Sequence, residues 1–200
     1  MLNFFRKTFL FSSLMFLVSG CCPAELVTPD SDSADATVPV TVGLQDGADC
    51  GWNVGDDACD FMLLDQNNEP WQLSENQGDL ILIDLSAMWC APCQAAASTA
   101  QAAHEQYADK GFQYVSVLIA DLQNDAVELS DVQYWTTTYG ITTAPVLQGD
   151  RGLLYSPSTI NGFPIQSWPT FIWVDRDGTV LFGLRGFSEE YIKQLTEQYL

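Results

Sequence analysis

The feature that most limits the possible folds of this chain is an apolar run that ends in two cysteines. Residues 80–85 are Leu or Ile except for Asp84, and Cys90 and Cys93 follow closely. Such a run is too short for a helix of its own, and apolar residues on both faces are typical of a central parallel strand. The segment after the cysteines is rich in alanine and contains neither Gly nor Pro until Gly111. The pattern predicts a buried strand, a sharp turn, and a helix whose first turn carries both cysteines.

The position of these cysteines favours redox chemistry. A cysteine at a helix N-terminus lies against unpaired backbone N–H groups and the positive end of the helix dipole, and both favour the thiolate. Cys93 lies one turn further along, on the same face as Cys90, and can form a disulfide with it. Pro92 fits the first turn, where its missing N–H costs nothing. We expect Cys90 to be the more exposed thiol and the nucleophile, with a pKa lowered from about 8.5 toward neutrality, and Cys93 to resolve the mixed disulfide.

Two motifs resemble the thioredoxin superfamily, and most closely its TlpA-like branch of extracytoplasmic thiol–disulfide oxidoreductases. Residues 89–93 have the sequence Trp-Cys-Ala-Pro-Cys after a hydrophobic strand, and residues 168–170 have Trp-Pro-Thr before a later one. The resemblance covers roughly residues 58–200. It implies a thioredoxin-like three-layer α/β sandwich, with a mixed central sheet and helices on both faces. It also implies protein thiol or disulfide substrates, an upstream redox partner, and no cofactor.

Four further positions gain a role from this resemblance. Asp84 interrupts a Leu/Ile strand, so burial should raise its pKa, and thioredoxins carry a buried acid there that would accept a proton from Cys93. The alternative is an acid at a bend in the strand that faces solvent. Pro169 matches the cis-proline beside the disulfide in the family. Trp168 and Trp89 would be aromatic walls of the substrate-binding site, and core packing is the alternative for both.

The chain departs from the family after the Cys-x-x-Cys motif. The family usually has a basic residue, an acid and a kinking proline there, and this chain has Gln94, Ala96 and Ser98 at the matching positions. We therefore expect a straighter helix that carries no acid to tune the site. The long interval from Cys93 to Pro169 fits the strand–helix insertion of the TlpA-like branch, and residues 155–167 are a candidate lid. His104, in mid-helix, is expected to be a surface residue.

The first 20 residues have the pattern of a signal peptide. Arg6 and Lys7 precede an apolar core, Phe9–Val18, that is shorter than the roughly 20 residues of a membrane-spanning helix. Val18-Ser19-Gly20-Cys21 resembles a bacterial lipobox, in which Cys21 becomes the acylated first residue. An ordinary secretory signal is the alternative. We expect a protein anchored by lipid to the cell envelope and facing the periplasm, since several acyl chains give stable anchoring.

Acidic residues strongly outnumber basic ones in the rest of the exported chain. Without the first 20 residues the chain has 5 basic and 26 acidic residues, a net charge of −21. Such a surface repels nucleic acid and anionic lipid headgroups, so neither is an expected partner. Residues 21–49, with three prolines and several acids, are expected to be a flexible acidic tether that precedes the folded domain at 50–200.

Cys50 and Cys59 are expected to form a structural disulfide, since an exported chain favours such bonds. A second redox pair that accepts electrons from the first is the alternative. A zinc site is the other, but it would need all four of Cys50, Cys59, Cys90 and Cys93 at an unusually wide spacing, so we expect no metal.

The remaining pattern alternates strands with helices and ends in a hairpin and a helix. The expected elements are a hairpin at 61–64 and 71–73, helices at 90–109, 126–139 and 189–200, and strands at 80–85, 112–120, 145–147, 170–175 and 179–184.

We expect a thiol–disulfide oxidoreductase that works in the reducing direction, with two alternatives. One is a peroxiredoxin-like thiol peroxidase, although the chain lacks a Pro-x-x-x-Thr-x-x-Cys arrangement and Ser86 is the only hydroxyl close upstream of Cys90. The other is a non-catalytic binding module on a thioredoxin scaffold, which an intact cysteine pair disfavours.

Overall fold

The computed structural model describes residues 43–44 and 49–200. The signal peptide, Cys21 and most of the expected tether lie outside the described residues. Within them, none of the helices is long and apolar enough to cross a membrane. Two residues of the expected tether form a short strand, β1 (Gly43–Leu44), which pairs with β2.

A five-stranded mixed sheet forms the centre, in the order β6-β5-β4-β7-β8. The central strand is β4 (Leu80–Ala87), and all eight of its residues are buried, which explains the apolar run. The parallel neighbours are β5 (Phe112–Ala120) and β6 (Val146–Gln148). The antiparallel side holds β7 (Thr170–Val174) and β8 (Val180–Arg185). The predicted mixed sheet is confirmed.

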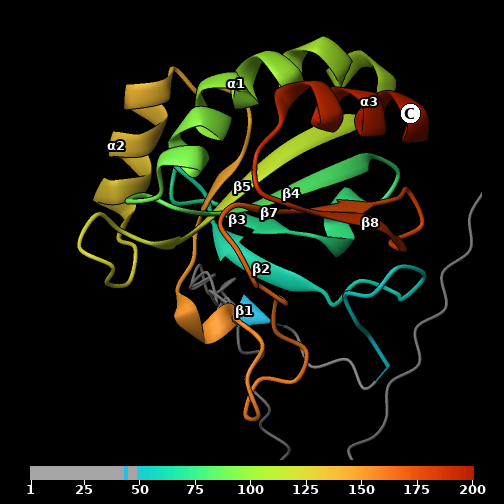
Figure 1. Cartoon of the computed structure of the whole chain (residues 1–200), viewed down its shortest axis with the longest axis horizontal. Helices are drawn as coiled ribbons and strands as arrows, with labels where there is room; N and C mark the ends of the chain where they lie inside the picture. The colour runs from blue at the N-terminus through green and yellow to red at the C-terminus, as the bar shows by residue number, and fades with distance from the viewer. Residues whose placement is uncertain (1–42, 45–48) are drawn as a thin grey trace, which may run out of the picture. The chain divides into compact units, whose positions relative to one another are not determined.

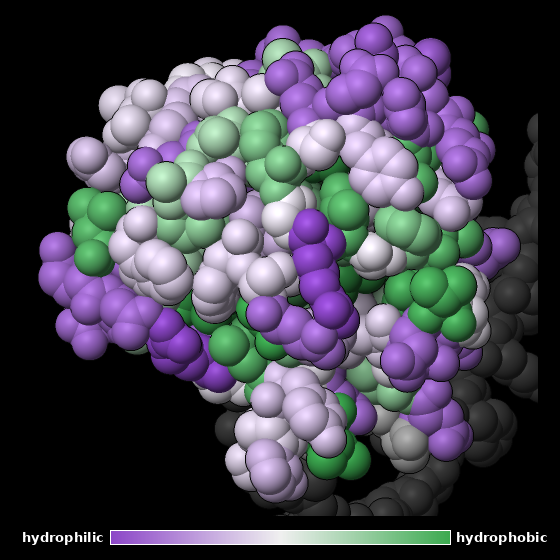
Figure 2. Space-filling view, in the orientation of Figure 1, coloured by the Kyte–Doolittle hydropathy of each residue, from purple (hydrophilic) through white to green (hydrophobic). Residues whose placement is uncertain are grey.

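The three α-helices of residues 49–200 pack on one face of this sheet: α1 (Ala91–Tyr107), α2 (Leu129–Tyr139) and α3 (Glu189–Tyr199) (Figure 1). The connections β4–α1–β5 and β5–α2–β6 step across the sheet in the same direction, and right-handed crossovers then put both helices on the same side. Exposed residues of α3 make one of the most hydrophilic areas in Figure 2.

In the part of the chain that the structure describes, the other face is covered by a small sheet and not by α-helices. The order of that sheet is β1-β2-β3, with β2 at Phe61–Leu64 and β3 at Pro70–Gln72. Its buried side chains join those of the 3₁₀ turn η3 (Arg151–Leu153) and Phe163 in a second core against the odd-numbered residues of β4. The α/β sandwich is confirmed, but the expectation of helices on both faces is wrong in this layer.

Local signals set where the helices begin and end. The first helix ends earlier than expected, and η2 (Ala108–Lys110) and a left-handed Gly111 (φ 73°) follow it. The second begins at Leu129 instead of residue 126, because Glu128 and Asp131 form a capping box there. The Ser188 hydroxyl accepts the Tyr191 N–H at the start of α3.

Candidate functional site

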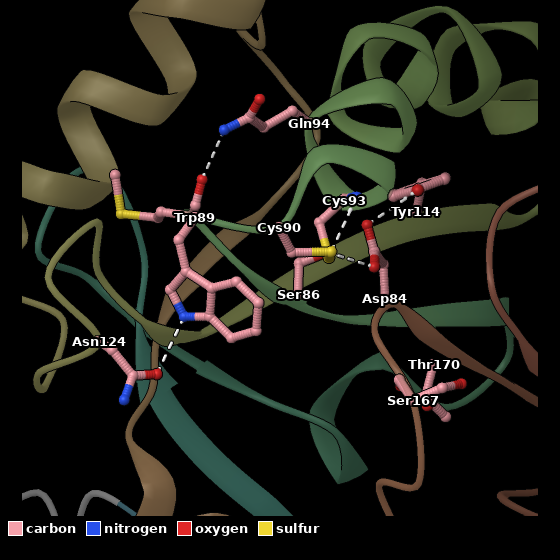
Figure 3. The surroundings of a disulfide bond; sticks show 11 residues. Asp84, Ser86, Trp89, Cys90, Cys93, Gln94, Tyr114, Asn124, Ser167 and Thr170 are labelled. Atoms are coloured by element: carbon pink, nitrogen blue, oxygen red, sulfur yellow. Dashed lines mark hydrogen bonds between the residues drawn. A yellow bond between two sulfur atoms is a disulfide. The ribbon is translucent and has the colours of Figure 1, made fainter.

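The two cysteines of the motif are bonded to each other where β4 passes into α1 (Figure 3). Cys90 is the N-cap residue of α1, Pro92 lies in the first turn, and the Cα atoms of Cys90 and Cys93 are 5.2 Å apart. The Cys93 backbone N–H donates to Cys90 Sγ at 3.3 Å. The predicted strand, turn and helix are confirmed, and the Cys90 sulfur faces the unpaired N–H groups that stabilise negative charge.

Accessibility differs between the two cysteine residues in the expected direction. Cys90 is 5 % exposed and Cys93 is 0 % exposed. The neighbours Ala91 and Pro92 are exposed. A disulfide substrate can therefore approach Cys90 over the tip of the helix, whereas Cys93 is closed off.

The Asp84 carboxyl lies beside the disulfide in the view of Figure 3, between Ser86 and Tyr114. Even-numbered residues of β4 face the helices, so Asp84 is on the side of the sheet that packs against α1. The residue is 1 % exposed. Ser86 Oγ donates to Asp84 Oδ1 at 2.7 Å, and the Tyr114 hydroxyl donates to Oδ2 at 3.0 Å. The alternative of a solvent-facing acid is excluded.

Burial raises the pKa of Asp84 from 3.8 to about 6, because water no longer stabilises the charged form. Hydrogen bonds from Ser86, Tyr114 and Ser116 oppose this effect by stabilising the carboxylate. Burial, helped by the negative charge of the same carboxyl, raises the pKa of Tyr114 well above its usual value. Asp84 can therefore exchange a proton near neutral pH, and Tyr114 stays a hydrogen-bond donor.

Trp89 is 42 % exposed and forms an aromatic wall beside Cys90. Its ring meets that of Trp168 edge to face, with the centroids 6.1 Å apart. Trp89 Nε1 donates to Asn124 Oδ1 at 3.0 Å, and Arg151 donates to the same oxygen. Trp89 is too exposed to be a core-packing residue only. Trp168 is half-buried and packs against both cores, so it contacts the core as well as Trp89.

Sequence reasoning missed Asn124 and Arg151. Asn124 has a left-handed backbone (φ 71°) in a turn in which Asp121 Oδ1 accepts the N–H groups of Gln123 and Asp125. Asn tolerates that conformation better than most residues. A polar Gln-Asn-Asp run predicts a turn, but nothing in it indicates which side chain the turn will contact.

Pro169 follows a cis peptide bond, as the resemblance predicted. The next residue, Thr170, pairs with Leu85 of β4, which brings Pro169 to the end of the sheet where Cys90 lies. The structure therefore gathers the predicted residues at one end of β4: Asp84, Trp89, Cys90, Cys93, Trp168 and Pro169.

Cys50 and Cys59 form the other disulfide, with Cα atoms 4.8 Å apart, at the opposite end of the sheet. The neighbouring residue Ala58 donates its N–H to the Gly178 carbonyl in the β7–β8 turn. The seven residue steps of β4 span about 23 Å between the two ends. This separation argues against direct electron transfer between the pairs and against a shared zinc site.

Two expectations about the surroundings need correction. His104 is half-buried, and its Nδ1 accepts the Tyr114 backbone N–H at 3.2 Å, so it is not a simple surface residue. Burial lowers its pKa.

The candidate lid, residues 155–167, is held by a buried aromatic residue. Phe163 is fully buried against Trp52, with ring centroids 4.6 Å apart. That contact fixes the segment to the second face of the molecule, which does not favour a lid.

Comparisons with known proteins agree with this geometry. The family model described as the AhpC/TSA family matches residues 54–182. The thiol-disulfide oxidoreductase ResA of Halalkalibacterium halodurans is 24 % identical over 144 residues, which cover 72 % of this chain and 75 % of ResA. The thioredoxin-like protein YneN of Bacillus subtilis is 25 % identical over 65 % of this chain and 70 % of its own length.

A solved structure extends the likeness to the fold. A Chlorobium tepidum protein, described as a candidate thiol:disulfide interchange protein DsbE, matches with a TM-score of 0.60 and 25 % identity. The match covers 74 % of this chain and 96 % of that one. The chain therefore belongs to the AhpC/TSA family and is a TlpA-like member of the thioredoxin superfamily.

Proposed function

We propose that this chain is a thiol–disulfide oxidoreductase of the bacterial cell envelope that reduces protein disulfides with Cys90 and Cys93. The observation that carries the proposal is the joined cysteine pair at the N-terminus of α1, above a buried carboxyl. The name of the ResA relative, a thiol-disulfide oxidoreductase, supports the reaction class.

The proposed reaction begins with both thiols reduced. The Cys90 thiolate attacks one sulfur of the substrate disulfide, and the other substrate sulfur leaves as a thiolate that takes up a proton. Cys93 then loses its proton to Asp84 and attacks the Cys90 sulfur. The second substrate thiol is released, and the Cys90–Cys93 disulfide forms. Two electrons pass to the substrate, and an upstream dithiol partner returns two electrons to the pair.

The surroundings support distinct roles in this cycle. The exposed face of Trp89 and the neighbouring Trp168 and Pro169 would hold the substrate segment beside Cys90. Asp84 favours the reducing direction in this proposal, since a buried base helps to form the Cys93 thiolate. The lipobox-like sequence at Cys21 supports attachment to the membrane by lipid, with the folded domain in the periplasm.

A thiol peroxidase is the second enzymatic candidate, because the family description names AhpC and TSA proteins. Ser86 is the only hydroxyl close upstream of Cys90 in the sequence. Its hydrogen goes to Asp84 Oδ1, so it does not assist Cys90 in the described site. This contact favours the disulfide reductase over the peroxidase.

Reduction of insulin by dithiothreitol tests the proposal. Wild-type protein is expected to speed precipitation of the insulin B chain, and Cys90→Ala is expected to remove the effect. A double variant, Cys50→Ala with Cys59→Ala, is the matched control, since it removes the distant pair and should retain turnover. No acceleration by folded wild-type protein would contradict the proposal, and consumption of hydrogen peroxide at a comparable rate would favour the peroxidase.

Trapping identifies the substrate and tests the roles of the two thiols. Cys93→Ala should hold its substrate on Cys90 as a mixed disulfide that dithiothreitol releases, because no second thiol is left to resolve it. Cys90→Ala should trap far less, since Cys93 is fully buried. Equal trapping by the two variants would contradict the assignment of Cys90 as nucleophile.

A further inference from the structure

Each carboxyl oxygen of Asp84 accepts a hydrogen bond from its own buried hydroxyl group. The Tyr114 hydroxyl donates to Oδ2 and Ser86 Oγ to Oδ1. Tyr114 is 1 % exposed and Ser86 is 0 % exposed. Two donors on one buried carboxyl are suited to the ionised form, which only accepts hydrogen bonds, because the protonated form must donate one itself.

Tyr114 reaches Asp84 because of its place in the sheet. It pairs with Leu82 in the parallel register of β5 against β4, and Asp84 lies two residues further along the same face. Its ring therefore crosses diagonally beneath α1 to the carboxyl. Its backbone N–H donates to His104 of α1, which ties the residue to the helix that carries the cysteines.

We propose that Tyr114 is a positioning residue for the thiol–disulfide reaction, whose hydroxyl fixes the Asp84 carboxyl toward Cys93 and keeps it ready to accept a proton. The inference rests on the proposed function for the role of Asp84 as proton acceptor. Tyr114 itself touches neither substrate nor sulfur in this role.

The hydroxyl has no competitor for this role among the charged groups of the described residues. On β5, Asp84 meets Tyr114 and Ser116, and on β7 it pairs with Phe171, which is apolar. The first turns of α1 bury Cys93, Ala96 and Ala97, none of which carries a charge. Burial and hydrogen bonds set the pKa of Asp84, with no contribution from a described cation. A lost hydroxyl would therefore not be replaced by a neighbouring charge.

Tyr114→Phe removes the hydroxyl and keeps the ring. A hydrogen bond to a charged group is worth enough that its loss should raise the midpoint of the Asp84 titration by about one pH unit. The ¹³C signal of the Asp84 carboxyl gives this midpoint without any enzymatic turnover. In single-turnover reduction, the pH at which resolution by Cys93 reaches half its maximal rate should move up by the same amount.

Tyr107→Phe is the matched control. Tyr107 is 3 % exposed, and its hydroxyl donates to Glu197 Oε1 at 2.8 Å, so the change removes a comparable bond from the same helix-side core, away from Asp84. Neither midpoint should move in this variant. In an Asp84→Asn background, Tyr114→Phe should no longer shift the pH profile of resolution.

An unchanged carboxyl midpoint in Tyr114→Phe, or an equal shift in Tyr107→Phe, would overturn the inference. Wild-type protein supplies a second measurement in case the variant does not fold. The ¹³Cζ signal of Tyr114 should change with the same midpoint as the Asp84 carboxyl, and a Tyr114 signal that ignores that midpoint overturns the inference too. If the carboxyl midpoint shifts while wild-type protein reduces no disulfide, the proposed function fails and the contact stands.

Discussion

Replacing Asp84 by Asn should make the folded domain more stable at neutral pH. The carboxyl is 1 % exposed, and burial raises its pKa from 3.8 to about 6. One pKa unit corresponds to 1.36 kcal/mol, so the shift represents about 3 kcal/mol of folding free energy. Asn has nearly the same shape, does not titrate, and its amide oxygen can still accept a hydroxyl hydrogen bond.

The direction follows from comparing the folded and unfolded chains. Because the folded-state pKa is the higher one, the protonated Asp84 contributes its full stability below about pH 3.8. That stability is lost as the pH rises through about 6, since the unfolded chain releases its proton first. Asp84→Asn should escape this loss, so the difference in unfolding free energy between variant and wild type should grow by about 2.4 kcal/mol from pH 4 to pH 7.5, since a small part of the loss has already occurred at pH 4.

Urea unfolding of the oxidised proteins, followed across this pH range, measures the difference. Other titrating groups affect both proteins alike and cancel. Asp109→Asn is the matched control, because it makes the same substitution at a residue that is exposed in η2, outside the sheet. A gap between Asp84→Asn and wild type that stays constant from pH 4 to pH 7.5 would refute the claim that burial destabilises the ionised carboxyl.

Three shorter predictions concern the cysteines. Replacing Cys50 and Cys59 together by Ala should lower the unfolding free energy by about 2.7 kcal/mol in the chain-entropy model, and calorimetry that finds no loss would contradict a stabilising role. In the reduced protein, iodoacetamide should label Cys90 faster than Cys93 near neutral pH, because it is more exposed and caps the helix; equal labelling in peptide maps would count against this. Cys21→Ala should release the protein from the membrane fraction of the native host, and unchanged fractionation would show that another anchor holds it.

The sequence predicted the central strand and the helix that carries the cysteine pair well, because both signals are local. An unbroken apolar run at 80–83 requires burial on both faces, and the Ala-rich stretch after Cys93 can only pack as a helix close to the sheet. One departure from the family after the motif, Gln94, also makes a local contact. Gln94 Nε2 now donates to the Met88 carbonyl at 2.8 Å and supports the turn before Cys90.

Contacts between segments far apart in the sequence could not be predicted in the same way. Asn124 reaches Trp89 across 35 positions, and Tyr114 reaches Asp84 across 30. No periodicity in either segment records these partners. Helices were wrongly expected on the second face for a related reason. The face that a helix covers follows from the direction of its crossover between strands, and that direction depends on the order of the strands in the folded sheet.

The register of β4 decides whether the site can work as proposed. Side chains alternate between faces, so a shift of one residue would turn Asp84 toward the small sheet and away from α1. Leu80 and Leu82 hold the register on the helix side, and Ile81 and Ile83 hold it on the other. The pairing with β5 changes register between Ser86 and Ala87, and the chain then turns to place Cys90 at the helix start. The same apolar residues that make β4 the core of the fold therefore also keep the carboxyl on the α1 side of the sheet, beside the disulfide.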